Sequence, residues 1–168
     1  STLMKIIAGA QGYTSGRMYI NDQEVVFHST KEAEKMGIAM IYQEFNMVPE
    51  LSVAENMYLG RLPKTQFGAV DWKKLYQDAD EVLKTLGLKF NCRSKVKNLS
   101  VAESQMTEIA KCLTIGAKVI IMDEPTAALT DEEIQILFRI ITELKEKGIS
   151  ILYISHRMDE IFQISDRL

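Results

Sequence analysis

Two adjacent carboxylates, Asp123 and Glu124, follow the apolar run Val119–Met122 and precede Pro125. The run predicts a strand buried on both faces, although a short apolar run alone does not separate a strand from a buried helix. Pro125 favours the strand, because proline cannot extend a ladder and keeps the preceding residue out of helical geometry. Ligands of open parallel sheets lie outside the carboxyl ends of the strands. The pair could therefore hold a metal ion and orient a water molecule; the alternative is a solvated acidic turn.

A second apolar segment also ends in polar residues. The segment Ser150–Ile154 predicts another buried strand, and Ser155 and His156 follow it. The chain between the two strands predicts an amphipathic helix, and this order of elements is typical of a parallel sheet. We therefore expect Glu124 and His156 to lie at the same rim. A lone histidine at a strand end more often has a structural role. The prediction that His156 is functional therefore depends on its expected position beside Glu124.

The elements near the two chain ends complete an α/β pattern. Those expected before residue 50 are a helix over 3–7 stopped by Gly9, a hairpin of strands 17–20 and 24–27, a short helix with a capping box at Ser29 and Glu32, and a strand over 38–42. Gln43 lies just beyond that last strand. A capping box at Thr130 and Glu133 predicts the helix that follows the acid pair. A final helix is expected after His156, with Met158, Ile161, Phe162 and Ser165 spaced along it.

The middle of the chain predicts helices only. Ser52 with Glu55 and Ser100 with Glu103 have capping-box spacing, and Asp71 opens a third helix. We therefore expect an α/β core of residues 1–50 and 114–168, interrupted by a helical subdomain over 51–113.

Composition excludes several classes of function. A net charge of −3 and the lack of a basic run give no general attraction to nucleic acid. Cys92 and Cys112 have no metal-type spacing, which suits plain apolar side chains in a reducing compartment. No apolar run approaches the ~20 residues that span a bilayer, so any membrane role is expected through a partner. The first residues read as a helix already under way, which predicts a fragment of a longer protein.

The order of these elements resembles the ATP-binding subunit of ABC transporters, and its motifs are similar to those of sugar importers of the ribose type. The matching segments are a Q-loop over Tyr42–Pro49 continued by LSVAENMYLGR, a signature helix over Leu99–Leu113, a Walker B motif over Val119–Thr130 and a His-loop over Tyr153–Ile161. They cover essentially all 168 residues in order. The resemblance implies a P-loop NTPase fold and the first nucleotide-binding domain of a two-domain chain.

The resemblance also implies ATP and Mg²⁺ as ligands and a role for each residue at the rim. Glu124 is the expected general base or water-orienting residue, and Asp123 is expected to hold Mg²⁺, usually through water. Gln43 is expected to reach the metal and the attacking water, and to report whether a membrane partner is docked. His156 is expected to donate to the γ-phosphate.

Further contacts to the nucleotide are implied at two helix starts. Ser1 is expected to be a direct Mg²⁺ ligand, and Thr2 a phosphate contact. Ser100, together with Val101 and Glu103, is expected to bind ATP held by the opposite domain of a head-to-tail pair.

Three features depart from the family pattern. Only Ser1 and Thr2 remain of the turn G-x-x-x-x-G-K-[ST], so this chain is expected to bind ATP poorly and to leave an unpaired strand edge. The signature reads LSVAE instead of LSGGQ. The same letters occur at residues 51–55, so simple helix capping is an alternative reading of the signature. Thr130 stands where an aspartate usually ends the loop after Walker B.

The resemblance implies an ATP-hydrolysing subunit that powers uptake of ribose or a related monosaccharide from the cytoplasmic face of the membrane. The expected partners are a second nucleotide-binding domain, transmembrane permease subunits and, through them, a sugar-binding protein, with no nucleic acid. Two alternatives stay open. One is an ABC-superfamily ATPase without transport, and the other is an inactive scaffold that lacks the P-loop.

Overall fold

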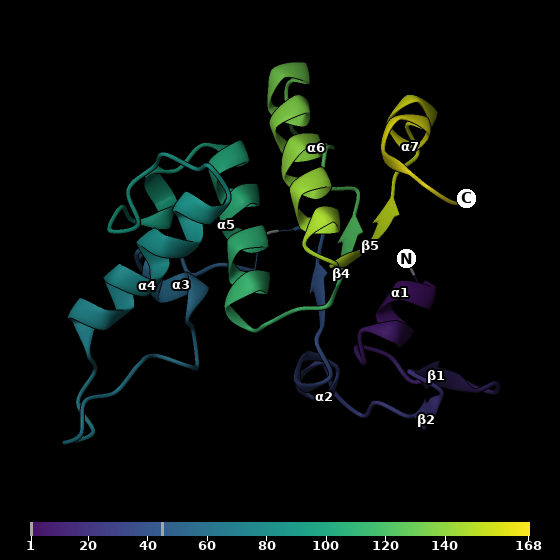
Figure 1. Cartoon of the computed structure of the whole chain (residues 1–168), viewed down its shortest axis with the longest axis horizontal. Helices are drawn as coiled ribbons and strands as arrows, with labels where there is room; N and C mark the ends of the chain where they lie inside the picture. The colour runs from purple at the N-terminus through teal and green to yellow at the C-terminus, as the bar shows by residue number, and fades with distance from the viewer. Residues whose placement is uncertain (1, 45) are drawn as a thin grey trace.

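The computed structural model describes residues 2–44 and 46–168. Figure 1 shows an α/β part, which contains both chain ends, beside a helical part drawn in teal. Ser1, predicted to bind Mg²⁺, and Phe45, within the predicted Q-loop, lie outside the described residues. Within the described ranges, no helix combines the length and the apolar character that crossing a bilayer requires.

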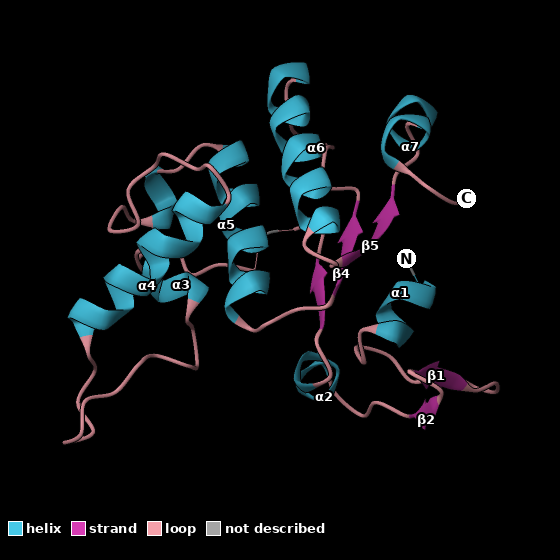
Figure 2. Cartoon of the chain, in the orientation of Figure 1, coloured by secondary structure: helices cyan, strands magenta, loops and turns pink. Residues whose placement is uncertain are grey.

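A parallel sheet forms the centre of the α/β part. Its strands are β3 (Ile38–Ile41), β4 (Val119–Asp123) and β5 (Ser150–Ile154), in the order β3-β4-β5. The predicted parallel arrangement is confirmed, and the three strands point the same way in Figure 2. Residues of other elements cover both faces of β4, which explains its continuous apolar run.

The two faces of the sheet belong to two different apolar clusters. Ile120 and Met122 of β4 join a core shared with the helical part, whereas Ile121 packs with Ala8, Phe27 and Ala33 on the other face. This alternation along one strand fixes its register, since a shift by one residue would exchange the two sets.

Two helices follow β4 and β5. Helix α6 (Asp131–Glu146) starts with the predicted Thr130–Glu133 capping box, and its buried stripe includes Leu137 and Ile141. In helix α7 (Met158–Ile164), the apolar residues Ile161 and Ile164 are partly buried. Met158 and Phe162 are exposed, while Glu160 is buried.

The N-terminal elements follow the predicted order with shorter strands. They are α1 (Thr2–Ile7), β1 (Met18–Ile20), β2 (Gln23–Val25) and α2 (Thr30–Lys35). Asn21 and Asp22 have φ values of 49° and 63°, which is the geometry of a two-residue hairpin turn. The predicted capping box at Ser29 is incomplete. The Glu32 carboxylate accepts a hydrogen bond from the backbone N–H of His28, whereas a capping box requires that of Ser29.

Three α-helices separate β3 from β4. They are α3 (Val53–Met57), α4 (Trp72–Thr85) and α5 (Val101–Thr114), and a short 3₁₀ helix, η1 (Val96–Asn98), precedes α5. The buried residues of α4 are Leu75, Ala79 and Leu83. They share one core with Ile41 and Ile120 of the sheet, so the helical part is packed continuously against the α/β part.

Candidate functional site

The ends of β4 and β5 bring Glu124 and His156 into contact. Nδ1 of His156 lies 3.3 Å from Oε1 of Glu124, as the strand order predicts. The backbone N–H of Glu124 also donates to the carbonyl of Ile154, with a distance of 2.9 Å. Pairing between β4 and β5 therefore continues one residue beyond β4. The His156 side chain is 71% exposed and that of Glu124 31% exposed, so both can reach a ligand from solvent.

Glu124 adopts an unusual backbone conformation. Its φ of 49° lies in the left-handed region, which non-glycine residues rarely occupy. Such strained residues are concentrated at functional sites, where the surrounding structure maintains them. Here the hydrogen bond to Ile154 and the following Pro125, which is buried, hold the turn. The chain therefore bends sharply at Glu124, the residue that the family resemblance suggests as the general base or water-orienting group.

Asp123 is the last residue of β4 and is only partly exposed. Mg²⁺ in phosphate-binding sites typically takes one or two carboxylates, with waters and substrate oxygens completing its shell. One strand-end aspartate fits that requirement. The described residues contain no group of three or more His, Cys, Asp or Glu side chains that could hold a metal ion.

Gln43 lies at the same end of the sheet as the two carboxylates. It is exposed and follows β3, whose Ile41 pairs with Met122 of β4. Among the described residues, no hydrogen bond joins Gln43 to Asp123 or Glu124. The topology thus places Gln43 on the rim without attaching it to the acid pair.

The two LSVAE segments form the same local structure. Ser52 and Ser100 each accept a hydrogen bond from the backbone N–H of the glutamate three residues later, and each glutamate accepts one from the backbone N–H of its serine. Both segments therefore contain complete capping boxes, as predicted. Capping alone does not distinguish them.

The surroundings of the two helix starts do differ. At α3, the backbone N–H groups of Val53 and Ala54 donate to the carbonyls of Ser94 and Cys92, each at 2.9 Å, and both residues are fully buried. At α5, Val101 is 44% exposed, and no corresponding loop covers its N–H among the described residues. Backbone N–H groups at a helix start bind anions when they are accessible. The start of α5 meets this condition, and that of α3 does not.

Thr2 is exposed at the start of α1. It is separated in the chain from every other predicted site residue except Ser1, which is not described. The structure gives no contact between Thr2 and Asp123, Glu124 or His156 in the described ranges.

A buried carboxylate, Glu160, lies behind the rim. Its Oε2 accepts hydrogen bonds from the hydroxyls of Thr126 and Tyr153, both at 2.8 Å, and of Ser155 at 3.0 Å. Burial, together with the adjacent Glu160, raises the pKa of the Tyr153 hydroxyl above its usual range, although the Thr126 hydrogen bond acts in the opposite direction. No sequence pattern singles out Glu160, because helical periodicity is read from apolar residues. The only hint is that hydroxyl residues flank both strand-end motifs.

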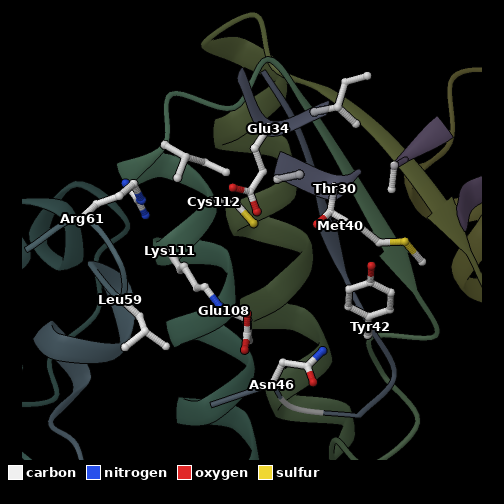
Figure 3. A pocket seen from close by; sticks show the side chains of 14 residues that line it. Thr30, Glu34, Met40, Tyr42, Asn46, Leu59, Arg61, Glu108, Lys111 and Cys112 are labelled. Carbon is white, nitrogen blue, oxygen red and sulfur yellow. Dashed lines mark ion pairs between the residues drawn. The ribbon is translucent and has the colours of Figure 1, made fainter. Parts of the chain in front are cut away.

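A separate pocket of about 160 Å³ lies between the sheet and α5, shown in Figure 3. It is lined by residues of the β3 end, including Tyr42, and of α5, including Glu108 and Lys111. Oε1 of Glu108 is buried without a hydrogen-bond partner, while its Oε2 lies 3.6 Å from Lys111. An unpaired buried acceptor is costly unless a ligand or partner completes it.

Arg61 contributes to the same pocket. Its guanidinium donates to the carbonyls of Met57 and Thr114 and to the Thr114 hydroxyl, which fixes the end of α3 to the end of α5. Burial lowers the pKa of this guanidinium. Arg61 therefore links the two helices that form this wall of the pocket.

Comparison with known proteins identifies related sequences over the whole chain. A family model described as ABC transporter matches residues 1–127. The ribose import ATP-binding protein RbsA of Caldanaerobacter subterraneus subsp. tengcongensis is 50% identical over 166 residues, which cover 99% of this chain and 34% of that protein. The ribose import ATP-binding protein RbsA 1 of Streptomyces avermitilis is 46% identical over 168 residues, which cover 100% and 32%. The chain spans about a third of the length of these relatives.

Solved structures show the same fold. A nucleotide-free ATP-binding cassette from an ABC transporter superposes with a TM-score of 0.83 at 26% identity, covering 98% of this chain and 69% of that one. A dimeric cassette in a post-hydrolysis state bound to ADP and Pi gives a TM-score of 0.76 at 25% identity, covering 95% and 70%. The parallel sheet, the motif order and these matches agree, and the chain belongs to the ABC transporter family.

Proposed function

We propose that this chain is part of an ATP-binding subunit that hydrolyses ATP to drive uptake of ribose or a related monosaccharide. The observation that carries the proposal is the contact between Glu124 and His156 at the carboxyl ends of adjacent parallel strands. The names of the two relatives, both ribose import ATP-binding proteins, support the choice of sugar.

The residues at the rim suit phosphoryl transfer to water. Glu124 would accept a proton from the attacking water or orient it, since its carboxylate is accessible beside His156 and its backbone is held by the hydrogen bond to Ile154. His156 would donate to a terminal phosphate oxygen while its other nitrogen faces Glu124. Asp123 would hold Mg²⁺, which when bound neutralises charge on the β- and γ-phosphates. Gln43 and Ser1 are the further metal contacts that we propose, and Thr2 is a phosphate contact.

We propose that the accessible start of α5 acts across a pair of nucleotide-binding domains. Ser100, Val101 and Glu103 would face a nucleotide bound by the opposite domain, with backbone N–H groups directed at its phosphates. Two of the similar structures are dimeric cassettes, which supports this arrangement. Residues 51–113 would form the helical subdomain that carries the signature helix, within an α/β core of 1–50 and 114–168.

The pocket beside Glu108 is our proposed contact with a permease subunit at the cytoplasmic face of the membrane. An N–H or cationic group of the permease would supply the hydrogen bond that Oε1 of Glu108 lacks. In the full-length transporter, Glu108→Ala should reduce sugar uptake far more than it reduces the ATPase rate of the isolated subunit. Equal losses of both activities would contradict this contact.

The test of the main proposal compares two polypeptides. One is this chain, and the other is a version extended upstream so that it carries a G-x-x-x-x-G-K-[ST] turn. We expect Mg-ATP affinity and ATPase activity in the longer form and little of either in the shorter. Absence of both activities from the longer form would instead favour a scaffold role.

A further inference from the structure

The buried carboxylate of Glu160 accepts hydrogen bonds from residues that follow β4 and β5. The residue is 3% exposed, yet it belongs to a helix whose apolar residues Met158 and Phe162 face solvent. Burying a carboxylate is costly unless several hydrogen bonds compensate for lost hydration. The other apolar residues of the helix, Ile161 and Ile164, are partly buried, so hydrophobic burial and the Glu160 carboxylate together set its orientation.

The compensating hydrogen bonds come from two separate loops. Thr126, two residues after Glu124, donates to Oε2 at 2.8 Å. Ser155, directly before His156, donates to the same oxygen at 3.0 Å. A single oxygen atom thus joins the segment after β4 to the segment after β5.

The other side of His156 is held as well. Nη1 of Arg157 forms an ion pair with Oε1 of Glu160 at 2.9 Å, although without hydrogen-bond geometry, and the Arg157 backbone N–H donates to the Ser155 hydroxyl at 3.0 Å. Both neighbours of His156 are therefore tied to one carboxylate. His156 itself is free of this network, and its imidazole projects from it toward Glu124.

We propose that Glu160 is a positioning residue, which sets the separation and orientation of His156 relative to Glu124 by binding the loops that carry them. A displacement of about 1 Å at a reacting group can cost a large factor in rate. Glutamine at this position keeps the shape but places an N–H₂ group among donors, so it should loosen the connection without leaving a cavity. The kinetic consequence rests on the proposed ATPase function, whereas the structural consequence does not.

The experiment uses the full-length subunit with Glu160→Gln, and Asp159→Asn as the matched control. Asp159 precedes it in the same helix and is exposed, so the control removes the same charge without touching either loop. Three quantities are measured: amide hydrogen exchange over residues 124–127 and 155–157, kcat, and KM for ATP. Thr126→Val and Ser155→Ala, each of which removes one donor, replace Glu160→Gln if that variant does not fold.

In Glu160→Gln we expect exchange in both loops to rise and kcat to fall about tenfold, with KM for ATP within about twofold of its original value. Thr126→Val should lower kcat in the original protein and have no further effect in the Glu160→Gln background. The control should match the unmodified protein in every measurement.

Unchanged exchange in both loops would overturn the proposal, whatever the kinetics. So would faster exchange with an unaltered kcat in an active enzyme, or a Thr126→Val effect that is fully additive. If exchange rises in Glu160→Gln and the unmodified subunit hydrolyses no ATP, the connection between the loops stands and the proposed function fails.

Discussion

Asn56 and Val48 are joined by a reciprocal pair of hydrogen bonds. The backbone N–H of Val48 donates to Oδ1 of Asn56 at 2.8 Å, and Nδ2 of Asn56 donates to the Val48 carbonyl at 3.1 Å. Asn56 is buried in α3. Its side chain makes the two hydrogen bonds with the backbone of Val48 that a neighbouring strand would make in a sheet. This pair fixes the chain a few residues beyond Gln43.

Replacing Asn56 by alanine should therefore destabilise the protein by about 2–3 kcal/mol, because it leaves buried backbone groups without partners. Urea unfolding measures the change in the free energy of unfolding. Asn98→Ala is the control, since Asn98 is exposed, and we expect a change within about 0.5 kcal/mol. Similar values for the two variants would contradict a role for the Val48 pair.

The acid pair gives a second prediction. In the full-length subunit, Glu124→Gln should retain Mg-ATP binding and lose kcat by about 10²–10⁴-fold, the usual contribution of a positioned acid–base group. The nucleotide-bound dimer should also persist longer. Equilibrium dialysis measures Mg-ATP binding, and the rate of phosphate release measures kcat. Near-normal turnover would remove Glu124 from the mechanism.

The repeated LSVAE segments provide an internal control for the signature. Ser52→Ala and Ser100→Ala each remove a helix cap, so each should destabilise the protein by about 1 kcal/mol. Only Ser100→Ala should also lower the ATPase rate, because the start of α3 is occupied by the carbonyls of Ser94 and Cys92. Thermal unfolding and ATPase assays of the two variants test this. Equal ATPase losses would show that Ser100 acts through capping alone.

The buried thiol of Cys112 predicts a dependence of stability on pH. Burial raises the pKa of Cys112 from 9.0 to about 12. The native state therefore keeps this proton where the unfolded chain releases it. The thiol's contribution to stability is complete below about pH 9 and is lost as the pH rises toward 12, at a slope of up to about 1.4 kcal/mol per pH unit.

Cys112→Ala should make the decline in stability above pH 9 shallower by that amount. Urea unfolding at several pH values between 8 and 10.5, repeated for both proteins, measures the difference in slope. Parallel curves would mean that the Cys112 thiol ionises equally well in the native state.

Local patterns predicted those features that depend on neighbours in the sequence. The capping boxes at Ser52, Ser100 and Thr130 need only residues three apart, and the strands of the parallel sheet follow from apolar runs with polar ends. The order of elements then placed Glu124 beside His156. At Ser29 the local pattern was insufficient, because Glu32 also reaches the preceding N–H of His28.

Features that depend on distant segments could not be predicted in this way. The two LSVAE segments have identical letters, and only the chain over 92–94 makes one of them inaccessible. Likewise, the spacing of residues along α7 does not indicate that Glu160 is buried, because the hydroxyls that bind it belong to Thr126 and Ser155 on other segments. A hydrogen-bond network made by residues from several segments produces no periodic pattern in the sequence of any one segment.

The pairing of Ile41 with Met122 has a consequence for how the molecule forms. Every residue of the helical part lies between these two paired residues in the sequence. Forming the sheet therefore requires β3 and β4, which are far apart in the sequence, to come together. Loop closure of this kind slows folding, whereas contacts between helices close in sequence form early. On the ribosome, α3 to α5 would therefore assemble first, and β3 would wait with its edge unpaired until β4 has been synthesised.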